Sequence, residues 1–262
     1  MKNQSIILFF ICFFFCLSSP HEVFANDSIP SLFEKALHES RDGDFKNALE
    51  SWNNVLLSSP NNAIALSNRG NVRLVLGDPE GAIMDQTSAL KLLPLEIDPH
   101  VNRGIAEEAL EQWNEAKSDY KWVLEREPDN SAALYNLGNI LGSVQSDWKQ
   151  AKLFFNKASL VRSDFAIARS SKALACYQLN QIDEAEQDLR SLIRKYPLFA
   201  DGRAALTALL WRKGSFGEAE SHWAAVVGLD GRYREEEWLL KVRRWPPGPI
   251  NDLMAFLDLE TV

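Results

Sequence analysis

The chain has 262 residues, with 28 lysines and arginines against 36 aspartates and glutamates, so its formal net charge at pH 7 is −8. This acidic balance excludes general nucleic-acid binding, which needs a basic surface that displaces counterions from phosphates. Two of the three cysteines, Cys12 and Cys16, lie in the first apolar segment, and the third is Cys176. We therefore expect no intramolecular disulfide, and a fold that is stable through packing alone.

The N-terminus has the three-part pattern of a secretory signal peptide. Lys2 precedes an unbroken apolar run at 6–17, and Val23 and Ala25 stand at the small-residue positions before the cleavage that we expect after Ala25. Twelve helical residues extend about 18 Å, short of the roughly 30 Å hydrocarbon core. We expect a cleaved signal peptide at 1–25 and export of the rest. The alternative is an uncleaved N-terminal anchor that holds the chain outside the cytoplasm, and any other membrane contact is expected to be peripheral or through partners.

One pattern recurs with a period of 34 residues. The segments 67–94 and 101–128 align at this offset, and Asn-Arg-Gly follows the first residue of both. A fixed period in this range is typical of stacked supersecondary units. The same offset relates four series of residues: Asn68, Asn102 and Asn136; Gly70, Gly104 and Gly138; Ala48, Ala82 and Ala116; Pro60, Pro94 and Pro128.

This pattern resembles the tetratricopeptide repeat, a helix-turn-helix unit with small residues in both helices and a closing proline. The resemblance implies an all-α fold, a right-handed superhelical solenoid of antiparallel helix pairs. Residues 26–233 are predicted to hold six repeats, of which the fourth is one residue longer. Their ranges are 29–62, 63–96, 97–130, 131–165, 166–199 and 200–233.

The second helix of each repeat pairs a small residue with a residue four positions later, mostly a large one. Residues at i and i+4 share one helix face, so the small residue lets two helices approach and the large one fills the gap beside it. Turn glycines are expected at Gly43, Gly77 and Gly214, and Glu111 stands where the third repeat would have one. The pairs are Ala48–Trp52, Ala82–Gln86, Ala116–Tyr120, Ala151–Phe155, Ala185–Leu189 and Ala219–Trp223.

Residues 234–262 follow the last repeat and are predicted to form C-terminal capping helices. The segment 233–244 keeps a helical pattern, and Trp245-Pro-Pro-Gly-Pro then interrupts it. Apolar residues at 250, 253, 254 and 257 have the spacing of a final amphipathic helix. We expect this helix to cover the exposed face of the sixth repeat. The alternative is that it occupies the groove of its own chain or of a neighbouring one.

The C-terminal half also carries a closer resemblance. The segments 194–211, 217–233 and 243–247 are similar to the C-terminal half of a tetratricopeptide family of photosynthetic organisms. That resemblance implies a scaffold in the thylakoid lumen or the periplasm, and it brings no known activity with it.

In this repeat family the first helix of each pair lines a concave groove, and the mapping gives ten candidate peptide-binding residues. Side-chain amides both donate and accept hydrogen bonds, so an asparagine ladder can pair with an extended polypeptide backbone. The aromatic residues would serve as apolar anchors. Alternatively, the amides bond to water or within their own helix and the aromatics are packed, which is the favoured interpretation for the tryptophan. The ten are Ser67, Asn68, Asn71, Asn102, Tyr135, Asn136, Asn139, Tyr177, Trp211 and Arg212.

The sequence argues against two other kinds of site. A clamp for carboxylate tails would need lysines at two groove positions that hold Phe33 and Asp98. The histidines after residue 25, His38, His100 and His222, are far apart in sequence, and no catalytic or phosphate-binding motif accompanies them. We therefore predict a protein that is not an enzyme and takes no cofactor, metal or small-molecule substrate. A hydrolase would require a buried cluster of titratable residues.

Two functions remain. The first is an exported scaffold that binds polypeptide segments in its groove, as an assembly factor for a photosynthetic membrane complex. The second is a structural or oligomeric module that acts through its C-terminal helices while the groove is idle. The sequence does not identify the partner or the oligomeric state, and it does not distinguish the thylakoid lumen from the periplasm.

Overall fold

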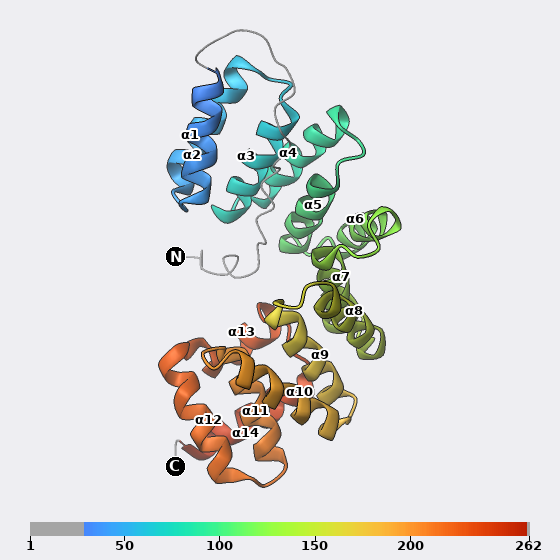
Figure 1. The fold of residues 1–262 in the computed structure, drawn as a ribbon, viewed down its shortest axis with the longest axis vertical. Helices are drawn as coiled ribbons and strands as arrows, with labels where there is room; N and C mark the ends of the chain where they lie inside the picture. Colours follow the sequence, from blue (N-terminus) through green and yellow to red (C-terminus); the bar gives the residue numbers. More distant parts are fainter. Residues whose placement is uncertain (1–28, 261–262) are drawn as a thin grey trace. The chain divides into compact units, whose positions relative to one another are not determined.

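A computed structural model describes residues 29–260, so the predicted signal peptide lies outside the described residues. This part of the chain is helical without strands, and none of its helices is long and apolar enough to cross a membrane. The helices, drawn in Figure 1, are α1 (Ile29–Arg41), α2 (Phe45–Ser58), α3 (Ala63–Val75), α4 (Pro79–Leu92), α5 (Ile97–Ala109), α6 (Trp113–Arg126), α7 (Ser131–Asn139), α8 (Trp148–Val161), α9 (Ala166–Gln178), α10 (Ile182–Lys195), α11 (Ala200–Arg212), α12 (Phe216–Leu229), α13 (Glu236–Lys241) and α14 (Pro247–Glu260).

The helices form two compact units. The N-terminal unit ends at Arg126 and holds α1–α6, and the C-terminal unit begins at Glu127 and holds α7–α14. In each unit, odd-numbered helices up to α11 pack against the following even-numbered helix, and most of these pairs pack against the next pair. Short connections make such neighbours antiparallel. The predicted all-α class of stacked helix pairs is confirmed. Below, the first helix of a repeat is its A helix and the second its B helix.

The small and large residues of the B helices form the interior as predicted. All six alanines and all six partners four residues later are at most 2% exposed. The glycine series of the A helices has the same origin. A Cβ on Gly104 would lie 2.7 Å from the ring of Tyr120, and one on Gly138 would lie 2.7 Å from Phe155. Glycine is therefore required where the A helix meets the large B-helix residue.

All six turns between A and B helices place one residue in the left-handed backbone region. Three of these residues are glycines and three are not, so Glu111 adopts the turn conformation despite its side chain. This region costs a residue with a Cβ about 1–2 kcal/mol. The residues and their φ angles are Gly43 (80°), Gly77 (82°), Glu111 (58°), Ser146 (57°), Asn180 (59°) and Gly214 (78°).

The extra residue of the fourth repeat is absorbed in a π-helical turn, Ile140–Val144, that follows α7. The Gln145 amide donates to the Ile140 carbonyl at 3.1 Å, five residues back. Single π turns are the usual way in which a helix accommodates an inserted residue. Trp148 packs closely on this turn, since a Cβ on Gly142 would lie 2.6 Å from its ring.

The segment after α12 is anchored by one buried carboxylate. Instead of the expected helix over 233–244, a 3-10 turn (Gly231–Arg234) precedes the short α13. Asp201 Oδ1 of α11 accepts hydrogen bonds from Tyr233 OH at 3.0 Å, Arg243 Nη2 at 2.6 Å and Trp245 Nε1 at 3.0 Å. All four residues are buried. We call them the Asp201 hub, and it ties the C-terminal segment to the sixth repeat.

The final helix contacts the sixth repeat, and also the fifth. It packs along α11 and α9, the A helices of repeats 6 and 5 (Figure 1). It touches α12 through Phe256, whose ring centroid lies 5.9 Å from that of Trp223. α14 therefore covers the A-helix side of repeats 5 and 6 of its own chain.

Candidate functional site

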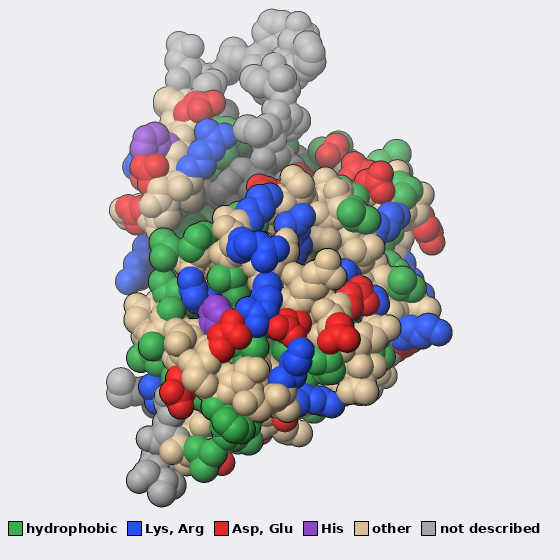
Figure 2. Space-filling model, turned by 60° about the horizontal axis from the view of Figure 1, so that its bottom comes forward, with side chains coloured by type: hydrophobic (Ala, Val, Ile, Leu, Met, Phe, Trp, Pro, Cys, Tyr) green, Lys and Arg blue, Asp and Glu red, His purple; other side chains and the backbone are tan. Residues whose placement is uncertain are grey.

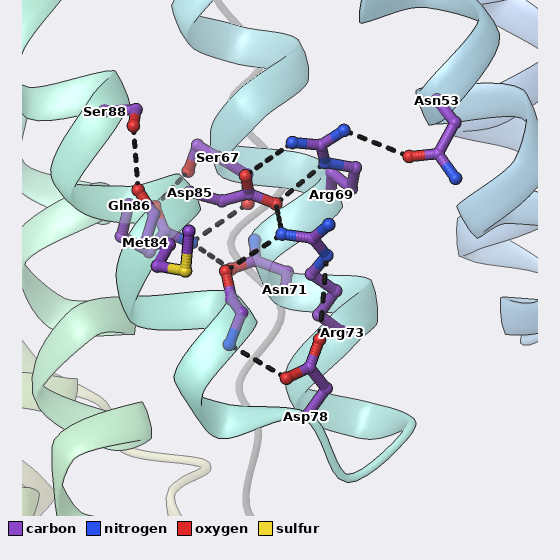
Figure 3. Close-up of polar contacts among 11 residues, drawn as sticks. Asn53, Ser67, Arg69, Asn71, Arg73, Asp78, Met84, Asp85, Gln86 and Ser88 are labelled. Atoms are coloured by element: carbon purple, nitrogen blue, oxygen red, sulfur yellow. Dashed lines mark hydrogen bonds and ion pairs between the residues drawn. The ribbon is translucent and has the colours of Figure 1, made fainter.

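Four of the ten candidate residues lie on neighbouring A helices of the N-terminal unit. Ser67, Asn68 and Asn71 belong to α3 and Asn102 to α5, and these two helices contact each other. All four are at most 3% exposed, so these side chains are buried in the structure. One physical reason is Gln86 of α4. Its side chain accepts a hydrogen bond from Ser67 Oγ at 2.8 Å and donates to Asn71 Oδ1 at 2.8 Å (Figure 3).

The asparagines keep hydrogen-bonding capacity that the described protein does not use. Asn68 Nδ2 and Oδ1, Asn71 Nδ2 and Asn102 Nδ2 are buried and have no hydrogen-bond partner among the described residues. A buried polar group without a partner costs about 1–3 kcal/mol. Such groups are therefore expected to be satisfied by water or by a ligand. This face, defined by Asn68, Asn71 and Asn102, is called the amide face below.

The charges next to the amide face are neutralised within the repeat. Arg69 binds Asp85 through two hydrogen bonds of 2.8 and 2.6 Å, and reaches Asn53 of the preceding repeat at 3.0 Å. Arg73 lies 2.9 Å from the same Asp85 and 3.8 Å from Asp78 (Figure 3). The amide face therefore presents neutral polar groups beside compensated ion pairs.

The same ion pair recurs in other repeats. Arg103 binds Asp119 at 2.7 Å and reaches Thr87 of the preceding repeat at 3.4 Å, and Lys172 binds Asp188 at 2.7 Å. Each pair joins an A helix to its own B helix 16 residues later. Figure 2 shows basic and acidic side chains interspersed on one face of the molecule, in keeping with such local pairing.

A buried titratable cluster surrounds Asp119. Burial opposes its ionisation, but hydrogen bonds from Arg103 and His100 hold its pKa below the ordinary value. Burial first, and then the nearby Asp119 charge, raise the pKa of Glu107 to about 7. The His100 ring stacks on Trp122 with 3.7 Å between centroids. Because the Asp119 carboxylate already bonds Arg103 and His100, the cluster has the geometry of a structural ion-pair network.

The other six candidates lie in the C-terminal unit and are not equivalent. Tyr135 is buried against Phe155 and Phe165, Asn136 is half-buried and Asn139 is buried, all on α7. Tyr177, Trp211 and Arg212 instead face the protein's own final helix. The packing interpretation of Trp211 agrees with its contacts, because its ring lies 4.7 Å from Phe216 and 5.8 Å from Phe256.

A polar contact joins α14 to this second group. Tyr177 OH donates to Asp252 Oδ2 at 2.7 Å, and Arg212 Nη1 lies 3.8 Å from the same carboxylate. The Gly248 amide donates to Gln178 Oε1 at 2.8 Å. Burial first, and then the hydrogen bond to Asp252, raise the pKa of Tyr177, so its hydroxyl stays protonated. The A-helix face of repeats 5 and 6 is therefore filled by the chain itself.

One further cluster has the residue types of a metal site. Ligand atoms of Cys176, Glu184 and Asp188 lie within 4.8 Å of one another. However, Lys152 and Lys172 bind Glu184 at 2.9 and 3.1 Å. Burial raises the pKa of the Cys176 thiol to about 11, so it remains protonated at neutral pH. A protonated thiol and lysine-bound carboxylates suit ion pairing better than metal ligation.

Comparison with known proteins assigns the fold to a family. The tetratricopeptide repeat model matches residues 33–95, 101–158 and 170–233, which is more than half of the chain. This chain is a tetratricopeptide repeat (TPR) protein. The family consists of repeat units that stack on their neighbours, as the helix pairs do within each unit here.

Curated relatives share only part of this TPR chain. The "TPR repeat-containing thioredoxin TDX" of Arabidopsis thaliana is 27% identical over 138 residues, covering 53% of this chain and 35% of that protein. The human "Mitochondrial import receptor subunit TOM34" is 33% identical over 91 residues, covering 33% of this chain and 29% of that protein. The chain thus spans about a third of the length of these relatives.

Solved structures are similar in fold. A tetratricopeptide repeat protein from Parabacteroides merdae superposes with a TM-score of 0.64 at 22% identity, covering 88% of this chain and 99% of that one. YrrB, described as "a TPR protein with an unusual peptide-binding site", superposes with a TM-score of 0.54 at 18% identity, covering 75% of this chain and 98% of that one.

Sequence reasoning missed three parts of the site in this TPR chain. Gln86 was read as a filler at the large-residue position, although its amide organises Ser67 and Asn71. The signal was present, because Gln86 is a polar residue in a series of otherwise apolar or aromatic ones. The recurring ion pairs were also visible as a basic residue followed 16 positions later by aspartate. The contact between Asp252 and Tyr177 joins residues 75 apart, and no local pattern indicates it.

Proposed function

We propose that this TPR protein is an exported, non-catalytic scaffold that binds polypeptide segments on the amide face of its N-terminal unit. The observation that carries the proposal is the set of buried side-chain amide groups without partners on Asn68, Asn71 and Asn102. An extended polypeptide offers carbonyl and amide groups at regular spacing, which is the complement of these donors and of the Asn68 acceptor.

The neutral surroundings define the kind of segment. Arg69 and Arg73 are both bound to Asp85, so neither cation is available to a ligand carboxylate. We expect recognition of backbone groups in an uncharged stretch, with an affinity that changes little between low and moderate salt. The names of the relatives are consistent with a role in protein binding, since one is a mitochondrial import receptor subunit and one has a peptide-binding site.

The proposed location is the thylakoid lumen or the periplasm, and the proposed process is assembly of a photosynthetic membrane complex. The predicted signal peptide and the similarity of 194–211 and 217–233 to a lumenal family support this part of the proposal. N-terminal sequencing of the protein from its native compartment tests it, with Asn26 as the expected first residue. Crosslinking mass spectrometry in the same cells identifies the partner. A chain that begins at Met1 and stays in the cytoplasm would contradict the proposed location.

The binding surface is tested by recovering partners with the tagged chain and then measuring binding of their uncharged peptides. The triple variant Asn68→Ala, Asn71→Ala and Asn102→Ala is expected to lose at least roughly tenfold in affinity, because several backbone hydrogen bonds are removed. Asn54→Ala is the matched control, since Asn54 is exposed on the B helix of the same unit. Equal binding by the triple variant and the control would refute the amide face as the site.

The second candidate, a module that acts through its C-terminal helices, has weaker support. The apolar residues Ile250, Leu253 and Phe256 of α14 are buried, and the Asp201 hub holds the segment before α14 on the C-terminal unit. Helices that are engaged in this way offer little surface for a permanent oligomer. Light scattering distinguishes the candidates, because a scaffold of the proposed kind is expected to be monomeric without its partner.

A further inference from the structure

The A-helix face of repeats 5 and 6 is contacted at positions that correspond between the two repeats. The residues are the twelfth and thirteenth of each repeat: Tyr177 and Gln178 on α9, Trp211 and Arg212 on α11. Three of them contact α14 through Asp252 or Gly248, and Trp211 contacts Phe256. This face therefore has a defined set of polar and aromatic contact points, and α14 satisfies all of them.

The occupant has the chemistry of an amphipathic helix. Ile250, Leu253 and Phe256 are buried, whereas Leu259 at its end is 60% exposed. Asp252 lies on the same helix and faces Tyr177 and Arg212, a hydroxyl donor and a cation. A helix that only covered apolar surface would not require a carboxylate beside an arginine and a buried tyrosine, so this contact selects for particular helices.

α14 shares one hydrophobic core with the segment before it, but the two have different polar anchors. The Asp201 hub ends at Trp245, and α14 begins at Pro247. Arg244, just before this junction, has a φ of 54°, in the region that disfavours residues with a Cβ. The polar contacts of the Asp201 hub include no residue of α14, so displacement of this helix would leave them in place.

We infer that the A-helix face of the C-terminal unit is a binding surface for an amphipathic helix and that α14 is its displaceable resident. The fitting partner is a helix with apolar residues at i, i+3 and i+6 and a carboxylate at i+2, as in Ile250, Asp252, Leu253 and Phe256. This surface is distinct from the amide face, which takes extended segments, so the two bind different classes of polypeptide.

The test uses the full chain and a fluorescent synthetic peptide of residues 246–260. The wild-type protein is expected to bind this peptide weakly, because its own helix competes at high effective concentration. Leu253→Ala in the protein weakens the resident helix and is expected to strengthen peptide binding at least roughly tenfold. A peptide with Asp252→Asn is expected to bind less tightly than the parent peptide. Asp252→Asn in the protein is the second variant, in case Leu253→Ala impairs folding.

Hydrogen exchange supplies the deciding control. Amides of 247–260 are expected to exchange faster than those of α11 in the wild type, and faster still in Leu253→Ala. Exchange of both helices at one slow rate, or peptide binding that does not increase in either variant, would overturn the inference and leave α14 a fixed part of the fold. If Leu253→Ala instead formed a dimer by exchanging α14 between two copies, the claim that the surface binds a helix of another protein would be overturned. The triple asparagine variant should bind this peptide normally, so failure here is distinguishable from failure of the amide face.

Discussion

Glu111 is a residue at which a single substitution should stabilise the protein through its backbone conformation. It occupies the turn between α5 and α6 with a φ of 58°, where the equivalent residues Gly43, Gly77 and Gly214 have φ of 78–82°. The left-handed region costs a residue with a Cβ about 1–2 kcal/mol, and glycine loses about 0.5–1 kcal/mol more backbone entropy on folding. The difference predicts that Glu111→Gly raises the free energy of unfolding by roughly 0.5–1 kcal/mol. Glu111 is exposed, so little packing is lost.

Urea unfolding followed by circular dichroism at 222 nm measures this change as a higher midpoint at an unchanged slope. Glu111→Ala is the control, because alanine removes the carboxylate but keeps the Cβ, and it should give no comparable gain. The reverse substitution, Gly77→Ala, should lower stability by about 1 kcal/mol or more. A stability of Glu111→Gly equal to or below that of Glu111→Ala would refute the backbone explanation.

Four other predictions follow from the packing and the charges. Gly104→Ala should lower the free energy of unfolding by about 1–2 kcal/mol, because contact with Tyr120 outweighs the better helix propensity of alanine; a gain in urea midpoint would contradict the close approach. Asn68→Leu should weaken peptide binding yet raise stability by about 1–3 kcal/mol, since it removes unsatisfied polar atoms; a loss of stability would mean that the amide is structurally bonded. Asp201→Asn should cost about 3–5 kcal/mol in urea unfolding, because a buried charge partner is removed; a cost below about 1 kcal/mol would deny that the hub anchors the C-terminal segment. Glu107 has a folded pKa of about 7 against an ordinary 4.5, so the folded state favours its protonated form. The free energy of unfolding of the wild type should therefore fall by roughly 2–3 kcal/mol as pH rises from 4.5 to 8. Glu107→Gln should remove most of that fall, and parallel pH profiles of variant and wild type would contradict the raised pKa of Glu107.

The fold could be predicted because its determinants recur at one period. The third repeat has Ala116 and Gly104 beside the Tyr120 ring, and the same pattern recurs in neighbouring repeats. The prediction of the fold therefore does not depend on similarity at a single repeat. The turn at Glu111 keeps the backbone conformation of the other turns although the residue is not glycine. Local preference there is overridden by the packing of helices on both sides.

The candidate site was less predictable because it depends on side chains that break the period. The Asn71 oxygen accepts a hydrogen bond from Gln86, and the other repeats have no glutamine at that position. The role of Tyr177 is decided by Asp252, from a segment outside the repeats. Contacts at large sequence separation leave no periodic trace, so the sequence indicated an aromatic residue on the face but not its occupant.

The π turn at Ile140–Val144 has a consequence for the whole C-terminal unit. One inserted residue rotates all later positions of a regular α-helix by about 100°, which would turn a buried side chain toward solvent. Here the wide turn takes up that rotation before Trp148, and α8 presents Ala151 and Phe155 to the interior with unchanged phase. The π turn of the fourth repeat thus accommodates a change in chain length, while the same positions of the following helix stay buried.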